Sequence, residues 1–195
     1  MHDVHTAQAR ADEMAPDGPL GRFDTQVLRL IVAHRPPALA QAARAVTMLG
    51  EPTVALGAVA AAAAWRLIQD CASGSDPRAL GRVAVALVVG VGGRSGLCRA
   101  LRRSRPPAAI WLAVPEGASF PSKHTTYAGL CAGLVVVLAA PGSSAHARTA
   151  ALGAATVVGA SRLVLGVHWP SDVVAAGALV NELLGWVVRP VSGTD

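Results

Sequence analysis

Three short polar stretches carry residue types that could react with a phosphate group or bind one. The stretches are residues 99–106, 120–124 and 161–172. The third places His168 and Asp172 four residues apart, next to an apolar run. If a helix begins near Pro170, a carboxylate at its first turn can hold one ring nitrogen of the histidine and leave the other free to attack. The pair is therefore a candidate nucleophile with an orienting carboxylate.

The same stretches hold groups that could bind and protonate a phosphate. The guanidinium groups of Arg105 and Arg162 can each grip two phosphate oxygens, and Lys123 adds a third positive charge. Such charge stabilises a phosphoryl-transfer transition state most strongly in a partly dry pocket. Ser122 could add a hydrogen bond at a helix start, and His124 could protonate a leaving oxygen.

Each residue also has an interpretation without chemistry. A histidine near a membrane interface is often only polar surface, and Arg162 could extend toward headgroups. Asp172 could stabilise the start of a helix through the helix dipole, and Ser122 could be an N-cap. The arginines at 99, 102, 103 and 105 could be solvated or contact headgroups. The combination of residues, rather than any one of them, favours chemistry.

The composition predicts what must position these residues. Of the 195 residues, 52 % are hydrophobic and 15 % are charged, whereas soluble domains usually carry about a quarter charged residues. The apolar excess is mostly Ala, Val, Leu and Gly, which suits closely packed membrane helices. We therefore expect an all-α polytopic membrane bundle of about six helices in one domain over residues 21–190, after a disordered tail at 1–20.

Apolar periodicity predicts an amphipathic interfacial helix over residues 22–34, followed by five or six spans. The expected spans are 38–50, 52–68, 79–97, 125–140, 148–165 and 171–188. The first is the weakest, because Arg44 interrupts it. The first two polar stretches share the loop before 125–140, and the third joins the last two spans. Because two crossings separate them, helix parity gathers all three stretches at one membrane face.

The positions of glycine and cysteine give weaker evidence about structure and function. Gly129 and Gly133 form a G-x-x-x-G pair, for which packing within the chain is favoured over dimerisation. The glycines at 90, 92, 93 and 96 fit no nucleotide-binding spacing and are interpreted as helix-packing residues. Three widely spaced cysteines imply neither a disulfide framework nor a zinc site. No cleavable signal peptide is visible. The net charge of +5 comes without a nucleic-acid recognition motif, so no nucleic-acid partner is expected.

In their order along the chain, the three stretches resemble the signature of the type 2 phosphatidic acid phosphatase (PAP2) superfamily. That signature is K-x6-R-P, then P-S-G-H, then S-R-x5-H-x3-D. The resemblance covers roughly residues 24–188 and agrees with a six-helix layout. The matching residues are Arg105 and Pro106, then Pro121, Ser122 and His124, then Ser161, Arg162, His168 and Asp172.

The resemblance implies a mechanism. His168 would attack phosphorus and form a phosphohistidine, with Asp172 orienting it. His124 would protonate the leaving group and then activate water. No metal and no cofactor would be needed. The phosphate oxygens would be bound by Arg105, Arg162 and Ser122.

The chain departs from the signature at two positions. Cys98 occupies the place of the first lysine, and Lys123 replaces the glycine before His124. We hypothesise that Lys123 restores the missing cation. Arg99 is the alternative, although it lies about 100° further round a helix than Cys98. A third interpretation is that Lys123 is only tolerated in a loop.

The resemblance implies a lipid phosphate phosphatase. Candidate substrates are polyprenyl phosphates or diphosphates, decaprenyl-phosphoryl sugar phosphates, phosphatidic acid and phosphatidylglycerol phosphate. A catalytically degenerate lipid-binding or scaffold homologue and a vanadate-dependent haloperoxidase are the alternatives. The Ala- and Arg-rich composition suggests that the chain comes from a bacterium with a GC-rich genome. The expected location is therefore the bacterial cytoplasmic membrane. Six spans with an inside N-terminus predict an extracytoplasmic site, whereas the positive-inside rule applied to the Arg-rich loop predicts a cytoplasmic one. The oligomeric state is not predicted.

Overall fold

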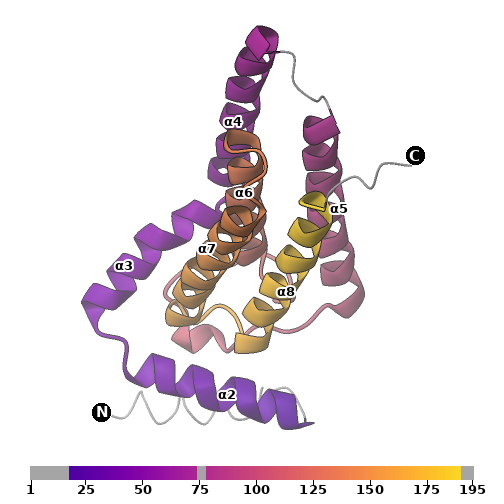
Figure 1. Cartoon of the computed structure of the whole chain (residues 1–195). Helices are drawn as coiled ribbons and strands as arrows, with labels where there is room; N and C mark the ends of the chain where they lie inside the picture. The colour runs from indigo at the N-terminus through magenta and orange to yellow at the C-terminus, as the bar shows by residue number, and fades with distance from the viewer. Residues whose placement is uncertain (1–17, 74–77, 190–195) are drawn as a thin grey trace.

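The computed structural model describes residues 18–73 and 78–189, and every regular element within these ranges is helical (Figure 1). This confirms the predicted all-α fold. The α-helices are α2 (Gly18–Ala33), α3 (Pro37–Thr47), α4 (Pro52–Ser73), α5 (Arg78–Leu101), α6 (Lys123–Ala139), α7 (Ser144–Val164) and α8 (Pro170–Val187). Two short 3-10 helices are η1 (Met48–Gly50) and η2 (Ala108–Ile110). Of the predicted tail, residues 18–20 belong to α2, and residues 1–17 lie outside the described residues.

Helix α6 is the centre of the bundle. It contacts α4, α5, α7 and α8, and its Leu130, Leu134 and Leu138 are at most 1 % exposed. Helices α4 to α8 run alongside one another between two ends of the molecule (Figure 1). Because α6 begins at Lys123, the central helix carries His124 at one end of the bundle.

Helix α2 is amphipathic and lies across the lower end of the bundle in Figure 1, where it contacts α7 and α8. Leu28 and Asp24 face inward and are at most 2 % exposed, whereas Leu20, Phe23 and Leu30 are more than half exposed. One apolar side therefore remains uncovered, as expected of a helix that rests at a membrane interface. The helix predicted over residues 22–34 is thus present, beginning four residues earlier.

Helix α3 corrects the prediction of a span over residues 38–50. It has 11 residues and ends at Thr47, far short of the ~20 residues that cross a bilayer core. Proline at position 37 starts the helix, and η1 followed by Pro52 breaks the helical path before a span can form. Instead of crossing, α3 packs against α7.

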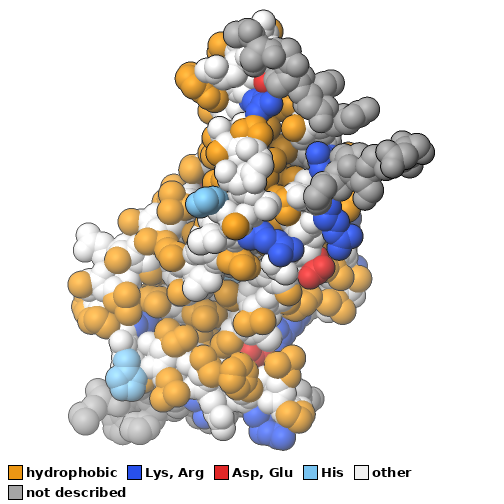
Figure 2. All heavy atoms as spheres, in the orientation of Figure 1, with side chains coloured by type: hydrophobic (Ala, Val, Ile, Leu, Met, Phe, Trp, Pro, Cys, Tyr) orange, Lys and Arg blue, Asp and Glu red, His pale blue; other side chains and the backbone are white. Residues whose placement is uncertain are grey.

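The outer helices are suited to a lipid environment. Within the described ranges, two helical windows are long and apolar enough to cross a membrane, Pro52–Cys71 and Ala79–Leu101. Their outward side chains include Trp65, Ile68 and Val88, each more than half exposed. Hydrophobic side chains also cover much of the visible flank in Figure 2. Many large exposed apolar side chains are unusual on soluble monomers, and a bilayer core would accommodate them.

Close helix packing explains one set of glycines and not the other. A Cβ on Gly129 would lie 2.9 Å from Ala155 Cβ, and one on Gly133 would lie 2.7 Å from Leu184. Packing of the G-x-x-x-G pair within the chain is therefore confirmed. On α5, a Cβ on Gly90 would meet Leu130, but the glycines at 92, 93 and 96 have open space around the Cβ position. For those three, the predicted packing role is wrong, because they face outward.

Replacing Gly129 with alanine should destabilise the bundle. The added methyl would press on Ala155 and on the backbone oxygen of Ala151 at 3.0 Å, and overpacking of this kind typically costs about 1–3 kcal/mol. At about 2–4 °C per kcal/mol for a chain of this size, thermal unfolding in detergent should shift down by several degrees. Gly93→Ala is the matched control and should not lower the midpoint. Equal midpoints for the two variants would contradict the packing argument.

Candidate active site

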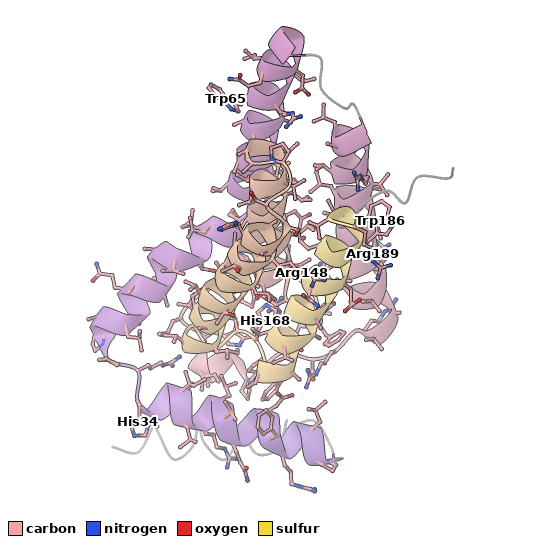
Figure 3. All side chains as sticks on the ribbon, in the orientation of Figure 1. His34, Trp65, Arg148, His168, Trp186 and Arg189 are labelled. Atoms are coloured by element: carbon pink, nitrogen blue, oxygen red, sulfur yellow. The ribbon has the colours of Figure 1, made fainter. Side chains whose placement is uncertain are left out.

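The three polar stretches meet at one end of the bundle. They come from the loop after α5, the start of α6 and the connection between α7 and α8. The backbone N–H of Ser122 donates to the Asp172 carbonyl at 3.2 Å, and Arg105 Nη1 lies 3.2 Å from His168 Nε2. In Figure 3, His168 lies inside the bundle near the lower ends of α7 and α8, whereas His34 lies outside it. Residues as far apart in the sequence as Arg105 and Asp172 thus form one site.

His168 and Asp172 form a buried pair, at 1 % and 0 % exposure. Nδ1 of His168 lies 3.3 Å from Oδ2 of Asp172, and the same oxygen accepts the Trp169 backbone N–H at 2.9 Å. Because α8 begins at Pro170, the carboxylate sits in its first turn, where the helix dipole favours negative charge. The local helix start therefore places the carboxylate against the ring.

The second ring nitrogen of His168, Nε2, carries a lone pair that contacts Arg105. A guanidinium can only donate hydrogen bonds, so the contact with Arg105 Nη1 requires Nε2 of His168 to accept. The proton then resides on Nδ1, facing Asp172. Burial lowers the pKa of His168 to about 4, and the Arg105 charge adds to this effect, while the hydrogen bond to Asp172 opposes it. The imidazole is therefore neutral at neutral pH, the form that can attack phosphorus.

Arg105 is held in place by backbone carbonyls. Its guanidinium donates to the carbonyl oxygens of Glu116, Gly117, Ala118 and Val167 at 2.7–3.2 Å. Burial lowers the pKa of Arg105, but an arginine remains charged at any physiological pH. The residue is thus a fixed cation beside Nε2 of His168.

Arg162 is a buried cation with hydrogen-bonding capacity to spare. It is 4 % exposed, and Nη1 donates to Thr47 Oγ1 at 2.9 Å. Its Nε is buried and has no hydrogen-bond partner among the described residues. A buried donor without a partner is costly, so Arg162 has an unused donor available to an anion.

His124 is held by a carboxylate that sequence reasoning missed. Its Nε2 lies 2.9 Å from Oε2 of Glu51, and η1 brings Glu51 there because Gly50 packs against the His124 backbone, leaving no room for a Cβ. The available signal was that Glu51 is the only acidic residue between Asp24 and Asp70. The site therefore contains two histidine–carboxylate pairs.

Ser122 precedes α6 but does not cap it with its side chain. The side chain is fully buried, and Oγ accepts a hydrogen bond from Thr125 at 2.9 Å. The Ser122 hydroxyl can still donate a hydrogen bond and could therefore bind an anion. The Ser122 backbone N–H already donates to the backbone carbonyl of Asp172.

The two candidate replacements for the missing lysine lie at the edge of the site. Lys123 Nζ is 3.2 Å from Glu116 Oε2, whose side chain is 84 % exposed. Arg99 is exposed at the end of α5. Arg94, one helical turn before Cys98, was not predicted to contribute, yet its Nε donates to the Pro121 carbonyl at 3.1 Å. The positive charge of Arg94 also helps to lower the pKa of Arg105.

Two further residues were missed. Arg103, for which the sequence left solvation, headgroup contact and phosphate binding open, lies 2.6 Å from Asp172 Oδ1 and 2.6 Å from Asp24 Oδ2. Asp24 itself is fully buried on α2. Within the described ranges, no three His, Cys, Asp or Glu side chains gather in a way that could hold a metal ion.

Comparisons with known proteins agree with this arrangement. The family model described as the PAP2 superfamily matches residues 79–194. A search of curated proteins finds no match to the chain. The fold is similar to the crystal structure of a transmembrane PAP2-type phosphatidylglycerolphosphate phosphatase from Bacillus subtilis, with a TM-score of 0.72 and 21 % identity over 96 % of this chain and 94 % of that one.

Burial of His168 predicts a pH-dependent stability. The unfolded chain should protonate this histidine near its ordinary pKa of about 6.5, whereas the folded chain does so only near about 4. Between these values the unfolded state binds more protons, so stability should fall as the pH is lowered, by up to about 3 kcal/mol. Thermal unfolding in detergent from pH 7 to 4 should show wild type losing more stability than His168→Gln. Parallel pH dependences would contradict the buried neutral histidine.

Proposed function

Because the chain belongs to the PAP2 superfamily, we propose that it is an integral-membrane phosphatase that hydrolyses a phosphate monoester or diphosphate of a lipid. One observation carries the proposal, namely a buried neutral His168 whose Nε2 lone pair points at the Arg105 guanidinium. A neutral imidazole needs no fixed cation beside it. An arginine is useful there when an anion binds next to both groups.

In the proposed first step, Nε2 of His168 attacks phosphorus in line with the lipid oxygen. The N–P bond forms as the P–O bond to the lipid breaks, which gives a phosphohistidine. The ring becomes positively charged, and Asp172 at Nδ1 stabilises that charge. His124 donates a proton to the departing oxygen, and Glu51 stabilises His124 while it is protonated.

In the second step, His124 takes a proton from water, and the resulting hydroxide attacks phosphorus. The N–P bond breaks, inorganic phosphate leaves, and His168 returns to its neutral form. The phosphate oxygens are held throughout by Arg105, by the unpartnered Nε of Arg162 and by the Ser122 hydroxyl. No step in this scheme requires a metal ion.

The substrate is proposed to be a lipid because the site lies at one end of an apolar bundle. The exposed apolar sides of α4 and α5 suit lipid tails, and α2 lies at the site end. Phosphatidylglycerol phosphate, which the similar Bacillus subtilis protein is named for, joins phosphatidic acid, polyprenyl phosphates and decaprenyl-phosphoryl sugar phosphates as candidates.

The membrane face of the site remains a prediction. Parity predicts the extracytoplasmic face of a bacterial cytoplasmic membrane only if six crossings follow a cytoplasmic N-terminus. Helix α3 is too short to be one of them, and α2 lies at the same end of the bundle as His168. A site outside the cytoplasm therefore requires α2 on the outer face as well.

Phosphate release from lipid phosphates should depend on His168. We expect the detergent-purified protein to release phosphate from at least one of the candidate lipids in the presence of EDTA, and His168→Ala to reduce the rate at least about 1000-fold, as expected when a nucleophile is removed. Inorganic phosphate is measured for each lipid in parallel.

Three outcomes would contradict this proposal. Equal rates for wild type and His168→Ala would exclude the phosphohistidine, and loss of activity with EDTA would exclude a metal-independent reaction. No release from any lipid would favour the degenerate homologue, in which Cys98 occupies the lysine position of the family signature.

Substituting Lys123 with glycine should cost far more activity than Arg99→Ala if Lys123 replaces the missing lysine. The ion pair with an exposed Glu116 is weak, so a bound phosphate could displace Glu116 from Lys123. Steady-state kinetics of the two variants on the best lipid substrate measures the ranking. The reverse ranking would contradict the hypothesis. A larger loss of activity for Arg94→Gln than for either of these variants would assign the role of the missing lysine to Arg94.

A further inference from the structure

A buried carboxylate on α2 is connected to the proposed nucleophile through an arginine and the Asp172 carboxylate. Asp24 Oδ2 accepts hydrogen bonds from Arg103 Nη2 at 2.6 Å and from Ser171 Oγ at 2.5 Å. Its Oδ1 accepts the Ser171 backbone N–H at 2.8 Å. Arg103 Nη1 in turn donates to Asp172 Oδ1 and to Ser171 Oγ, each at 2.6 Å. The chain of contacts thus runs from Asp24 through Arg103 to Asp172 and His168.

The two oxygens of Asp172 have different partners. Oδ2 faces His168 Nδ1 and the Trp169 backbone N–H, while Oδ1 faces Arg103. A carboxylate held only at Oδ2 could rotate about its terminal torsion, which is a broad and soft one. The bond to Arg103 removes that freedom. It therefore fixes the direction in which Asp172 presents its charge to the imidazole ring.

The net charge of this cluster affects the proposed reaction. Asp24 and Asp172 are both fully buried, and Arg103 is the cation that joins them, with a side-chain exposure of 18 %. With His168 neutral, the three charged groups sum to one negative charge. That charge is available to stabilise the positive ring that forms when His168 takes up a phosphoryl group. If Asp24 were neutral, Arg103 would instead cancel the charge of Asp172.

No motif residue lies on α2, yet this helix supplies the outer carboxylate. Asp24 is on the inward side of the helix, next to Phe23, whose side chain is 55 % exposed. Arg103 also lies over the Trp169 ring, with its guanidinium carbon 6.0 Å from the ring centroid, so the arginine is held on a second side. The geometry is that of a fixed support, which an exposed ion pair would not provide.

We propose that Asp24 and Arg103 are positioning residues for the proposed reaction, which hold the Asp172 carboxylate and preserve its charge for the phosphorylated form of His168. This inference rests on the proposed function and extends it to a helix outside the signature motifs. Neither residue touches the phosphate. Their effect reaches the reaction through Asp172 alone, so it should appear in kcat and much less in KM.

The test compares four proteins, namely wild type, Asp24→Asn, Arg102→Gln and the double variant Asp24→Asn with Arg103→Gln. Asp24→Asn should lower kcat at least tenfold with KM within about twofold, since only the charged ring that develops during the reaction loses its stabilisation. Arg102→Gln is the matched control, because Arg102 is exposed and its side chain donates to the backbone carbonyl of Arg99, away from Asp172. It should retain wild-type kcat.

The double variant separates the charge effect of Asp24 from mere folding. Removing both the Asp24 and the Arg103 charge restores the single negative charge on Asp172, so kcat should recover part of the loss seen in Asp24→Asn, and the remaining loss measures the missing bond between Arg103 and Asp172 Oδ1. A structural role alone would make the double variant worse than the single one, since more buried bonds are lost. A double variant slower than Asp24→Asn, or wild-type kcat in Asp24→Asn, would overturn the proposal.

Binding of orthovanadate provides a readout that needs no lipid substrate. Vanadate mimics the five-coordinate phosphoryl group and bonds to the attacking nitrogen, so its affinity follows the transition state. Titration calorimetry should show affinity at least tenfold weaker for Asp24→Asn than for wild type and unchanged for Arg102→Gln. Equal affinities for wild type and Asp24→Asn would overturn the inference. Absence of lipid phosphate release from wild type would count against the proposed function alone.

Discussion

The buried contact between His168 and Asp172 imposes opposite demands on two neighbouring groups. The ring must remain neutral, and burial achieves this directly by lowering its pKa. The carboxylate must remain charged in the same low-dielectric place, which is unfavourable unless several donors compensate. The structure provides the Trp169 N–H, the first turn of α8 and Arg103. Much of the architecture at this end of the bundle follows from keeping that one charge buried.

The same requirement explains why the site gathers elements from the whole chain. Arg103 needs a second anion, and α2 supplies it. Arg105 lies close enough to contact Nε2 and is tied down by carbonyls of the loop before α6. Arg162 comes from α7 and contacts Thr47 at the end of α3. Without such contacts, the arginine side chains near His168 would be free to change conformation. The short helices α2 and α3 therefore help to hold these arginines in place, although neither is long enough to span a membrane.

Sequence reasoning succeeded where the information was local. The four-residue spacing of His168 and Asp172 is a property of one helix start, and the placement of the polar stretches at one end follows from the order of the helices. It failed where a partner comes from a distant element. Glu51 and Asp24 are isolated acidic residues with no motif around them, and only the packing of η1 and α2 reveals their partners. The prediction of a span over residues 38–50 was wrong because prolines and a 3-10 turn limit the length of α3. A hydropathy pattern does not report such breaks in a helix.

The supports contributed by Asp24, Thr47 and Glu51 all lie before residue 79, where the match to the family model begins. Under the proposed mechanism, selection can act on the rate of the reaction through a part of the chain that carries none of the signature residues. Two homologues with identical motifs can diverge in turnover if one of them changes its α2 helix or its η1 turn. If the proposed supports act as described, paralogues that share every signature residue need not be interchangeable in a cell, and chimaeras that exchange the first 51 residues would take on the turnover of the donor.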